Sequence, residues 1–355
     1  MNLFDPLQIR DVTFRNRIAV SPMCQYSSID GAVDDWHLVH LGARAAGGAG
    51  AVLTEAMAVV PEGRISPFDL GLWNDTQAEA LARVVRFVHA QGAVFGPQLA
   101  HAGFKASTQT PWQGHGKTAE AAEGGWTPVY GPSAKPFSPS SLEPVAMTAE
   151  DIARVVRAFA EAAGRALETG CNLLEIHAAH GYLLHEFLTP LVNLRTDEYG
   201  GTFENRTRLV REVVVAVREV WPERLPLWLR ISGTDWSRGG WTVEDSVALA
   251  MMVKPLGVDL IDCSSGGAVP RAEIPVGPGY QVGLSEQVRR GAGMLTGAVG
   301  LITSPQQAQA ILAREQADVV LLGREMLRDP HWPLRAAHEL KQEAAWPVQY
   351  ERAKW

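Results

Sequence analysis

The motif His177-Ala178-Ala179-His180-Gly181-Tyr182 follows a short apolar segment. Two imidazoles three residues apart at a strand end can converge on one small group, and a nearby phenol can donate a proton. The spacing is compatible with recognition of a carbonyl or oxyanion, with a metal site and with a structural pair. A zinc or iron site needs further ligands. No spacing selects them from Glu55, Glu175, His185 and Asp262. We therefore favour recognition of an oxygen-bearing group and predict no metal.

Glycines form a second group, Gly297-Ala298-Val299-Gly300, and Gly323-Arg324 follows later. Backbone N–H groups at glycines and a guanidinium together suit a phosphate. The chain lacks a Gly-x-Gly-x-x-Gly after a strand, and its Gly116-Lys117-Thr118 has Pro111 where a P-loop carries its first Gly, which argues against a dinucleotide domain and a P-loop. Gly300, Gly323 and Arg324 are therefore predicted to bind a phosphorylated cofactor or substrate.

Both groups follow short apolar segments that alternate with amphipathic stretches, a pattern typical of parallel β/α units. The predicted strands are residues 17–21, 51–55, 94–99, 173–177, 227–232, 260–264, 295–299 and 319–322. Predicted helices include 76–90, 148–169 and one beginning at Ser304-Pro305. The eight predicted strands, alternating with helices, predict an α/β fold: a single (β/α)8 TIM barrel over residues 1–355. Its site is expected at the carboxyl ends of the strands.

Two segments are predicted to decorate the barrel. Residues 7–14 are expected to form a β-hairpin that caps one end. Residues 104–146, after the third strand, are an insertion rich in Gly, Pro and Ser that carries several aromatic residues. At that position the insertion would lie over the mouth as a lid, and a surface loop without a role is the alternative.

Composition narrows the class of protein. Hydrophobic residues make up 46% of the 355, which excludes fibrous and disordered classes. Acidic residues outnumber basic ones, 39 to 32, without a cationic run, which argues against nucleic-acid and membrane partners. Cys24, Cys171 and Cys263 are too scattered for a disulfide framework or zinc cluster. With no secretory signal or membrane span in the sequence, we expect a cytoplasmic protein.

Several blocks of sequence carry a resemblance to a known family. They are residues 21–26 (SPMCQY), 61–65 (PEGRI), 98–103 (QLAHAG), 175–187 (EIHAAHGYLLHEF), 193–201 (NLRTDEYGG) and 323–325 (GRE). Together they resemble the old yellow enzyme family of flavin-dependent ene-reductases, in particular its bacterial branch, over residues 4–355.

The resemblance implies non-covalently bound FMN at the mouth of the barrel. The residues implied to contact the flavin ring are Ser21, Pro22, Met23, Cys24, Ala56, Gln98 and Arg230, while Gly300, Gly323 and Arg324 hold its phosphate. It also implies that Tyr26, His177 and His180 bind the substrate and that Tyr182 donates a proton. Arg230 would favour the anionic reduced flavin, and Cys24 would tune the flavin potential.

The implied reaction reduces the activated C=C bond of an α,β-unsaturated carbonyl compound. NADPH, or NADH, delivers a hydride to flavin N5, and the reduced flavin passes it to the β-carbon of the alkene. Hydrogen bonds from His177 and His180 stabilise the enolate charge, and Tyr182 protonates the α-carbon.

One position departs from the family pattern, and the C-terminal residues resemble a family feature. Phe104 stands where members commonly carry Arg, so a cofactor or substrate contact from that position is in doubt. Residues 346–355 resemble a tail by which relatives reach a neighbouring subunit's site. This assigns Arg352 to a partner's substrate pocket and implies a homodimer or homotetramer.

Three other functions are alternatives. A metal-dependent barrel hydrolase would use the His177 and His180 pair. A binding protein on this scaffold would hold a ligand without turnover. A dienoyl-CoA reductase would need an iron–sulfur cluster, which three scattered cysteines cannot ligate.

Overall fold

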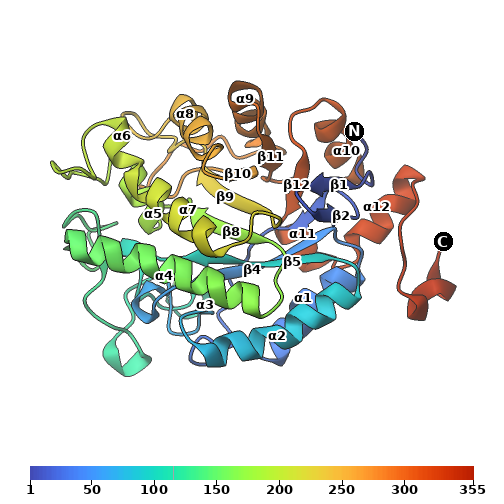
Figure 1. The fold of residues 1–355 in the computed structure, drawn as a ribbon, viewed down its shortest axis with the longest axis horizontal. Coiled ribbons are helices and arrows are strands. Elements are labelled where there is room, and N and C mark those ends of the chain that lie inside the picture. The colour runs from blue at the N-terminus through green and yellow to red at the C-terminus, as the bar shows by residue number, and fades with distance from the viewer. Residues whose placement is uncertain (115) are drawn as a thin grey trace.

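The computed structural model describes residues 1–114 and 116–355, and its centre is a closed barrel of parallel strands (Figure 1). The barrel strands are β3 (Ile18–Val20), β4 (Ala51–Ala58), β5 (Val94–Ala100), β8 (Leu174–Ala178), β9 (Leu227–Ser232), β10 (Leu260–Ser264), β11 (Leu295–Ala298) and β12 (Val319–Leu322). They are paired in chain order, and β12 closes the ring on β3. The predicted (β/α)8 barrel is confirmed, with each predicted strand in place.

Helices surround the barrel. The longer ones are α1 (Asp35–Ala46), α2 (Asp75–Ala90), α4 (Ala149–Glu168), α7 (Arg208–Val220), α8 (Val243–Val253), α9 (Val282–Ala292), α10 (Pro305–Ala313) and α12 (Trp332–Leu340). Shorter ones are α3 (Pro111–Gly114), α5 (Leu183–Leu188), α6 (Phe203–Arg206), α11 (Arg324–Arg328) and the 3-10 turns η1 (Pro61–Gly63), η2 (Gly103–Lys105), η3 (Ala121–Glu123) and η4 (Val348–Ala353). No described helix is both long and apolar enough to span a bilayer.

Capping side chains set the starts of two of the predicted helices, α4 and α10. The Thr148 side chain accepts from the Asp151 N–H before α4, and Ser304 accepts from the Gln307 N–H before α10. Pro305 occupies the first turn of α10, where its missing N–H costs nothing. Local sequence therefore fixes these boundaries.

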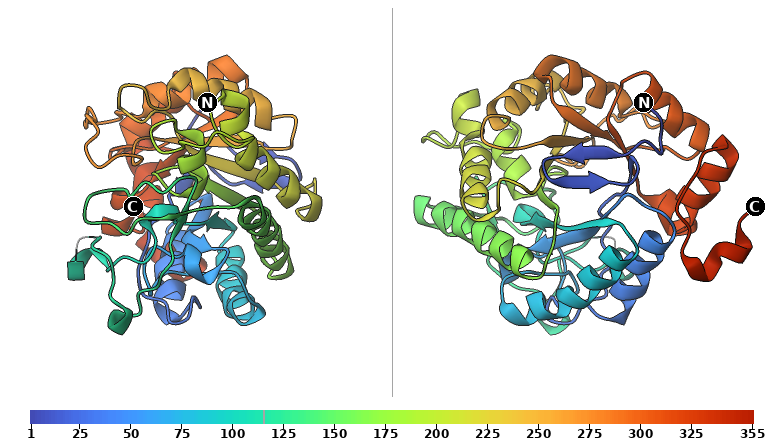
Figure 2. Two further views of the ribbon diagram at one scale, coloured as in Figure 1. Left: turned by 90° about the vertical axis from the view of Figure 1, so that its left-hand side faces the viewer. Right: turned by 45° about the vertical axis from the view of Figure 1, so that its right-hand side comes forward.

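A β-hairpin of β1 (Leu7–Ile9) and β2 (Val12–Phe14) lies across one end of the barrel (Figure 2, right). Phe14 stacks on Trp228 of β9 with ring centroids 5.6 Å apart, and both side chains are buried. The predicted hairpin is confirmed. Its apolar contact closes the end of the barrel opposite the site, so chemistry is confined to the other end.

Alternate side chains of one strand lie on the same side, from the closed end of the barrel to its open mouth. On β9, Trp228, Arg230 and Ser232 share one side because side chains alternate every two residues. The parallel register sets Arg230 beside both His177 of β8 and Asp262 of β10. A polar layer therefore lies above the apolar floor.

Residues 104–146 pack on the loops at the carboxyl ends of the strands. Lys105 Nζ donates to the carbonyls of His180 and Gly267, at 2.7 and 2.6 Å. The insertion contains the parallel pair β6 (Tyr130–Gly131) and β7 (Val145–Ala146). Phe104 is buried and meets Phe137 edge to face, in an apolar cluster rather than at a charged site. The insertion thus borders the mouth; residue 115 within it lies outside the described residues.

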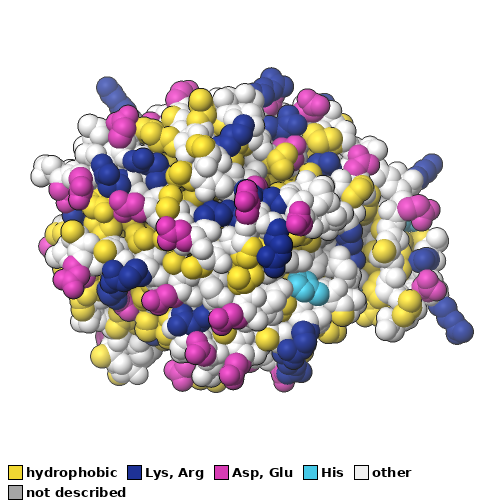
Figure 3. All heavy atoms as spheres, viewed as in Figure 1, with side chains coloured by type: hydrophobic (Ala, Val, Ile, Leu, Met, Phe, Trp, Pro, Cys, Tyr) yellow, Lys and Arg dark blue, Asp and Glu magenta, His cyan; other side chains and the backbone are white. Residues whose placement is uncertain are grey.

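The surface carries charges of both signs. On the face shown in Figure 3, Lys and Arg side chains are interspersed with Asp and Glu side chains. Neither sign dominates this face, as the sequence composition predicts.

Candidate active site

His177, His180 and Tyr182 converge at the carboxyl end of β8. The ring centroids of His177 and His180 are 5.1 Å apart, those of His177 and Tyr182 are 5.1 Å apart, and those of His180 and Tyr182 are 6.5 Å apart. His177 Nδ1 is buried without a hydrogen-bond partner in the described structure. An unpaired buried polar atom is costly, so this nitrogen is a candidate contact for a ligand.

His180 is held on three sides. Its ring Nε2 lies 2.7 Å from Ser264 Oγ at the end of β10, and its backbone N–H donates to Ser232 Oγ at the end of β9. Its carbonyl accepts from Lys105 of the insertion. Three different segments therefore fix His180, one through its ring and two through its backbone, which limits the entropy lost when a ligand binds.

Burial sets the protonation states of these groups. Desolvation, with the Arg230 cation adding to it, lowers the pKa of His177 and of His180 well below the usual range. Each imidazole is therefore neutral at pH 7 and carries one N–H. Burial raises the pKa of Tyr182 well above that of a free phenol, so its hydroxyl keeps its proton. Desolvation lowers the pKa of Lys105 to about 8.

A buried charged cluster lies beneath the histidines. Arg230 Nε is 3.1 Å from Asp262 Oδ2, and Gln98 Nε2 donates to Glu175 Oε1 at 2.7 Å. Burial, with the charge of Asp262, raises the pKa of Glu175 to about 8, and burial raises that of Asp262. Sequence patterns suggested Glu175 and Asp262 only as unselected metal ligands. The sequence signal that could have selected them is a carboxylate inside an otherwise apolar predicted strand.

Residues 21–26, after β3, are pinned to β4. Glu55 Oε2 accepts from the Gln25 N–H at 2.9 Å, and Glu55 Oε1 lies 3.3 Å from His37 Nε2. His37 of α1 in turn contacts Asp34 through Nδ1 at 2.6 Å. No sequence pattern pointed to His37, because its partner is on another element. This chain of contacts fixes the loop that presents Cys24 and Tyr26.

Cys24 and Tyr26 keep their protons. Burial raises the pKa of the Cys24 thiol well above its usual range, and the carboxylates of Asp69 and Glu55 add to the effect. Burial also raises the pKa of Tyr26. The Tyr26 ring meets that of Trp112, from the insertion, edge to face at 5.7 Å. Cys24 is therefore no thiolate nucleophile.

Asp69 is a buried acid near this group that sequence reasoning did not single out. Its oxygens accept from Ser66 Oγ at 2.7 Å and from the Ile65 N–H at 2.8 Å. Burial raises its pKa to about 7. A small cavity of about 10 Å³ is lined by both Asp69 and Tyr182.

A cavity of about 160 Å³ lies between the loops after β11 and β12. It is lined by Gly300, Gly323 and Arg324, the three residues predicted to hold a phosphate, and by Arg328. Gly300 has φ 118°, and a Cβ there would lie 2.9 Å from Gln281 Nε2. A side chain at Gly300 would therefore be strained and would crowd the wall of the cavity.

The remaining predicted ring contacts border the same region. Ser21 donates its backbone N–H to the Leu322 carbonyl of β12, and Met23 Sδ lies 3.7 Å from where a Cβ on Gly323 would be. Pro22, between them, is partly buried. Ala56 is paired with Gln98 across β4 and β5. The structure thus joins the loop after β3 to the cavity of Gly323.

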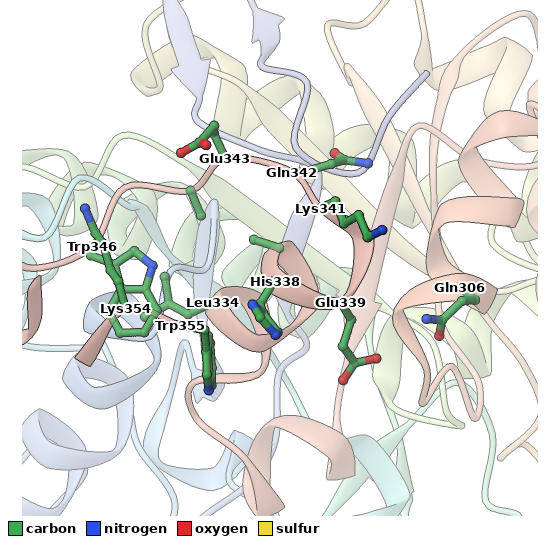
Figure 4. Close-up of a pocket in the computed structure, with 12 residues that line it drawn as sticks. Gln306, Leu334, His338, Glu339, Lys341, Gln342, Glu343, Trp346, Lys354 and Trp355 are labelled. Carbon is green, nitrogen blue, oxygen red and sulfur yellow. The ribbon is translucent and has the colours of Figure 1, made fainter. Parts of the chain in front are cut away.

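Arg352 is the exception among the predicted site residues. It is exposed on the C-terminal tail, which leaves the outer helical layer at α12. The tail packs Trp355 on His338 with ring centroids 4.8 Å apart, and the groove between tail and α12 is drawn in Figure 4. Within this chain, Arg352 is not among the residues that line the cavity beside Gly300.

Fold and site together define a barrel enzyme with a glycine- and arginine-lined cavity and a neutral imidazole pair at one mouth. A family model described as "NADH:flavin oxidoreductase / NADH oxidase family" matches residues 2–343. The chain belongs to this family, which is the old yellow enzyme family, and it is an oxidoreductase. Among the described residues, no group of three or more His, Cys, Asp or Glu side chains is arranged to hold a metal.

Individual relatives agree with this assignment. The chain is 47% identical over 353 residues to an NADPH dehydrogenase of Bacillus velezensis, covering 99% of this chain and 98% of that protein. An NADPH dehydrogenase of Bacillus licheniformis is 48% identical with the same coverage. The structure of morphinone reductase in complex with tetrahydroNAD superposes with a TM-score of 0.78 at 26% identity, covering 98% of this chain and 93% of that one.

Proposed function

We propose that this chain is an FMN-dependent NAD(P)H oxidoreductase that reduces the activated C=C bond of α,β-unsaturated carbonyl compounds. The observation that carries the proposal is the convergence of two neutral imidazoles and a protonated phenol, His177, His180 and Tyr182, at the mouth of the barrel. The relatives named NADPH dehydrogenase support NADPH as the reductant, with NADH as the second choice.

The residues present fit FMN. Gly300 leaves room where a Cβ would crowd the cavity wall, and Arg324 and Arg328 supply positive charge for a phosphate. Arg230 Nε pairs with Asp262 Oδ2, and the terminal nitrogens of its guanidinium are the proposed contacts with the flavin ring. The other proposed ring contacts are Ser21, Pro22, Met23, Cys24, Ala56 and Gln98. The protonated Cys24 thiol is consistent with non-covalent binding.

The chemistry that FMN supplies when bound is the relay of a hydride from a nicotinamide to an alkene. His177 and His180 donate their N–H groups to the carbonyl oxygen of the substrate and stabilise the negative charge that develops there. The hydroxyl of Tyr182 donates its proton to the α-carbon. Tyr26 contacts the substrate from the other side, next to Trp112.

The remaining proposals concern the domain, the insertion and the association of subunits. Residues 1–355 act as one cytoplasmic FMN-binding domain, with residues 104–146 as the border, and lid, of the mouth. Arg352 extends toward the substrate pocket of a neighbouring subunit in a homodimer or homotetramer. The exposed position of Arg352 on a tail outside its own barrel supports this assignment.

Anaerobic mixing tests the proposed reaction. The purified, FMN-replete protein is reduced with one equivalent of NADPH and then mixed with cyclohexenone, and the flavin absorbance is followed. We expect bleaching by NADPH and recovery on addition of the enone, with cyclohexanone as product. Bleaching without recovery would show an NADPH oxidoreductase that does not act on enones.

Tyr182→Phe tests the proton donor. The ring and its packing stay, and only the acidic hydroxyl is lost, so we expect enone reduction to slow by about 10-fold while solvent supplies the proton instead. Unchanged rate and unchanged stereochemistry of deuterium incorporation from D₂O would assign the proton to water.

A further inference from the structure

We propose that His185 and Asp235 are positioning residues, which hold the turn His180-Gly181-Tyr182 through one fixed tautomer of the His185 imidazole. Both side chains are fully buried, and they contact each other. The catalytic consequence rests on the proposed function, whereas the tautomer is a property of the protein alone.

The turn between His180 and Tyr182 needs to be held. His180 has φ 61° and Gly181 has φ 71°, so two successive residues are in the left-handed region. For a residue with a Cβ, such as His180, this conformation is strained. The loop after β10 also approaches so closely that a Cβ on Gly181 would lie 2.1 Å from the Gly267 carbonyl oxygen. Such a turn persists only where its surroundings enforce it.

His185 supplies that enforcement. The Gly181 N–H, at the centre of the turn, donates to His185 Nδ1 at 2.9 Å. His185 lies on α5, one turn further along the chain, and Nδ1 accepts only when it carries no proton. Because Nδ1 accepts, the ring proton of His185 must be on Nε2.

Asp235 fixes the proton there. His185 Nε2 lies 3.0 Å from Asp235 Oδ1 in the loop after β9. The other oxygen, Oδ2, accepts from the Trp241 N–H at 2.8 Å and from Thr189 Oγ1 at 2.5 Å. Burial acts to raise the pKa of Asp235, but its contacts with His185, Thr189 and Trp241 hold it below the usual value. A carboxylate facing Nε2 selects the tautomer in which Nδ1 accepts.

Asp235→Asn is the sharpest test because its geometry is forced. The Trp241 N–H needs an acceptor, so the amide oxygen of the new Asn takes the place of Oδ2 and its NH₂ faces His185 Nε2. Nε2 must then accept, and the proton moves to Nδ1. Two donors, Nδ1–H and the Gly181 N–H, would face each other across 2.9 Å, and the turn that carries His180 and Tyr182 is displaced.

We expect Asp235→Asn to slow reoxidation by cyclohexenone by about 10²-fold, the loss that a misplacement of about 1 Å can cause. FMN content and NADPH oxidation by O₂ should stay within about 2-fold of wild type. Thr189→Val is the matched control. It removes one hydrogen bond from the same carboxylate but leaves the carboxylate facing Nε2, so enone reduction should be nearly unchanged.

A double-mutant cycle separates positioning from stability. His185→Asn keeps an acceptor oxygen where Nδ1 was and cannot change tautomer. In that background, Asp235→Asn should add less than about 3-fold to the loss in enone reduction, because the two side chains act through one contact. Additive losses would show that Asp235 acts by another route.

The tautomer itself is read from ¹⁵N NMR of histidine-labelled protein. We expect an unprotonated Nδ1 for His185 in the wild type and a protonated Nδ1 in Asp235→Asn. A wild-type ring protonated at Nδ1, or a switched ring with unchanged enone reduction, would overturn the inference. If the wild type does not reduce enones at all, the proposed function fails, while the NMR result still decides the tautomer.

Discussion

The two sides of the barrel mouth are built by different means. Beside β11 and β12, the cavity is formed around glycines, and its cations Arg324 and Arg328 are exposed. Beside β8, the site is made of side chains: buried Ser264 holds the ring of His180, and His177 lies next to Arg230 in the strand register. A site made from backbone is therefore broken by adding atoms, whereas a site made from side chains is broken by removing them.

The largest effect is expected from removing the imidazoles. His177→Ala with His180→Ala should leave FMN bound and NADPH oxidation by O₂ largely intact, while enone reduction falls. Loss of one well-placed donor costs on the order of 10² to 10³ in rate. Stopped-flow reoxidation by cyclohexenone measures this, and a double variant with normal enone turnover would remove both histidines from the mechanism.

The second effect compares two arginines. Arg230→Met leaves Asp262 buried without its cation, which should lower the free energy of unfolding by about 3–5 kcal/mol. Arg324→Met, on the exposed side, should change it by less than about 0.5 kcal/mol. Urea unfolding of the FMN-free proteins gives both values. Equal stabilities for the two variants would contradict the claim that Arg230 compensates a buried charge whereas Arg324 does not.

The third prediction is that the free energy of unfolding depends on pH through Asp69, a buried acid near the side-chain site. Burial raises the pKa of Asp69 to about 7 in the folded chain, from an ordinary value of 3.8. Both states are protonated below that ordinary value, so the full stability is present there. As pH rises toward 7, only the unfolded state ionises, and the folded protein loses stability on the order of 4 kcal/mol.

Asp69→Asn removes this loss. The amide can donate to Ser66 Oγ and accept from the Ile65 N–H, as a protonated Asp69 would. The difference in unfolding free energy between variant and wild type should therefore grow from pH 4 to 7 and then level off. A difference independent of pH would show that Asp69 is not protonated in the folded state.

The smallest effect is expected from adding one methyl group to the backbone side. Gly300→Ala places a Cβ 2.9 Å from Gln281 Nε2 at φ 118°, a strain of about 1–2 kcal/mol. FMN affinity should fall by about 10-fold, with enone reduction at saturating FMN unchanged. Fluorescence titration of the FMN-free protein measures it. Gly277→Ala, at a glycine whose Cβ would meet nothing within 4 Å, is the matched control.

The fold was predictable because its signals are local. The eight barrel strands are short, mostly apolar runs, and Thr148 and Ser304 cap helices within three residues of themselves. The N-terminal hairpin also needs only neighbouring residues. The extension of β4 to Ala58 was missed, because it depends on pairing with Ala100 of β5.

The site was predictable only in part. Residues at strand ends, such as His177, Gln98 and Arg230, fall at positions that a barrel brings together. Their partners come from distant elements, and only the register and loop packing decide which side chain they meet. Asp235 is 50 residues from His185 in the sequence, and nothing near it predicts the 3.0 Å contact. The role proposed for Arg352 needs a second copy of the chain, which one chain cannot test.

A crystal structure of the protein reconstituted with FMN tests the central claim most directly. We expect the phosphate of FMN in the cavity of Gly300, Gly323 and Arg324, and the flavin ring between residues 21–24 and the His177 and His180 pair. FMN found elsewhere, or a folded protein that takes up none, would contradict the account.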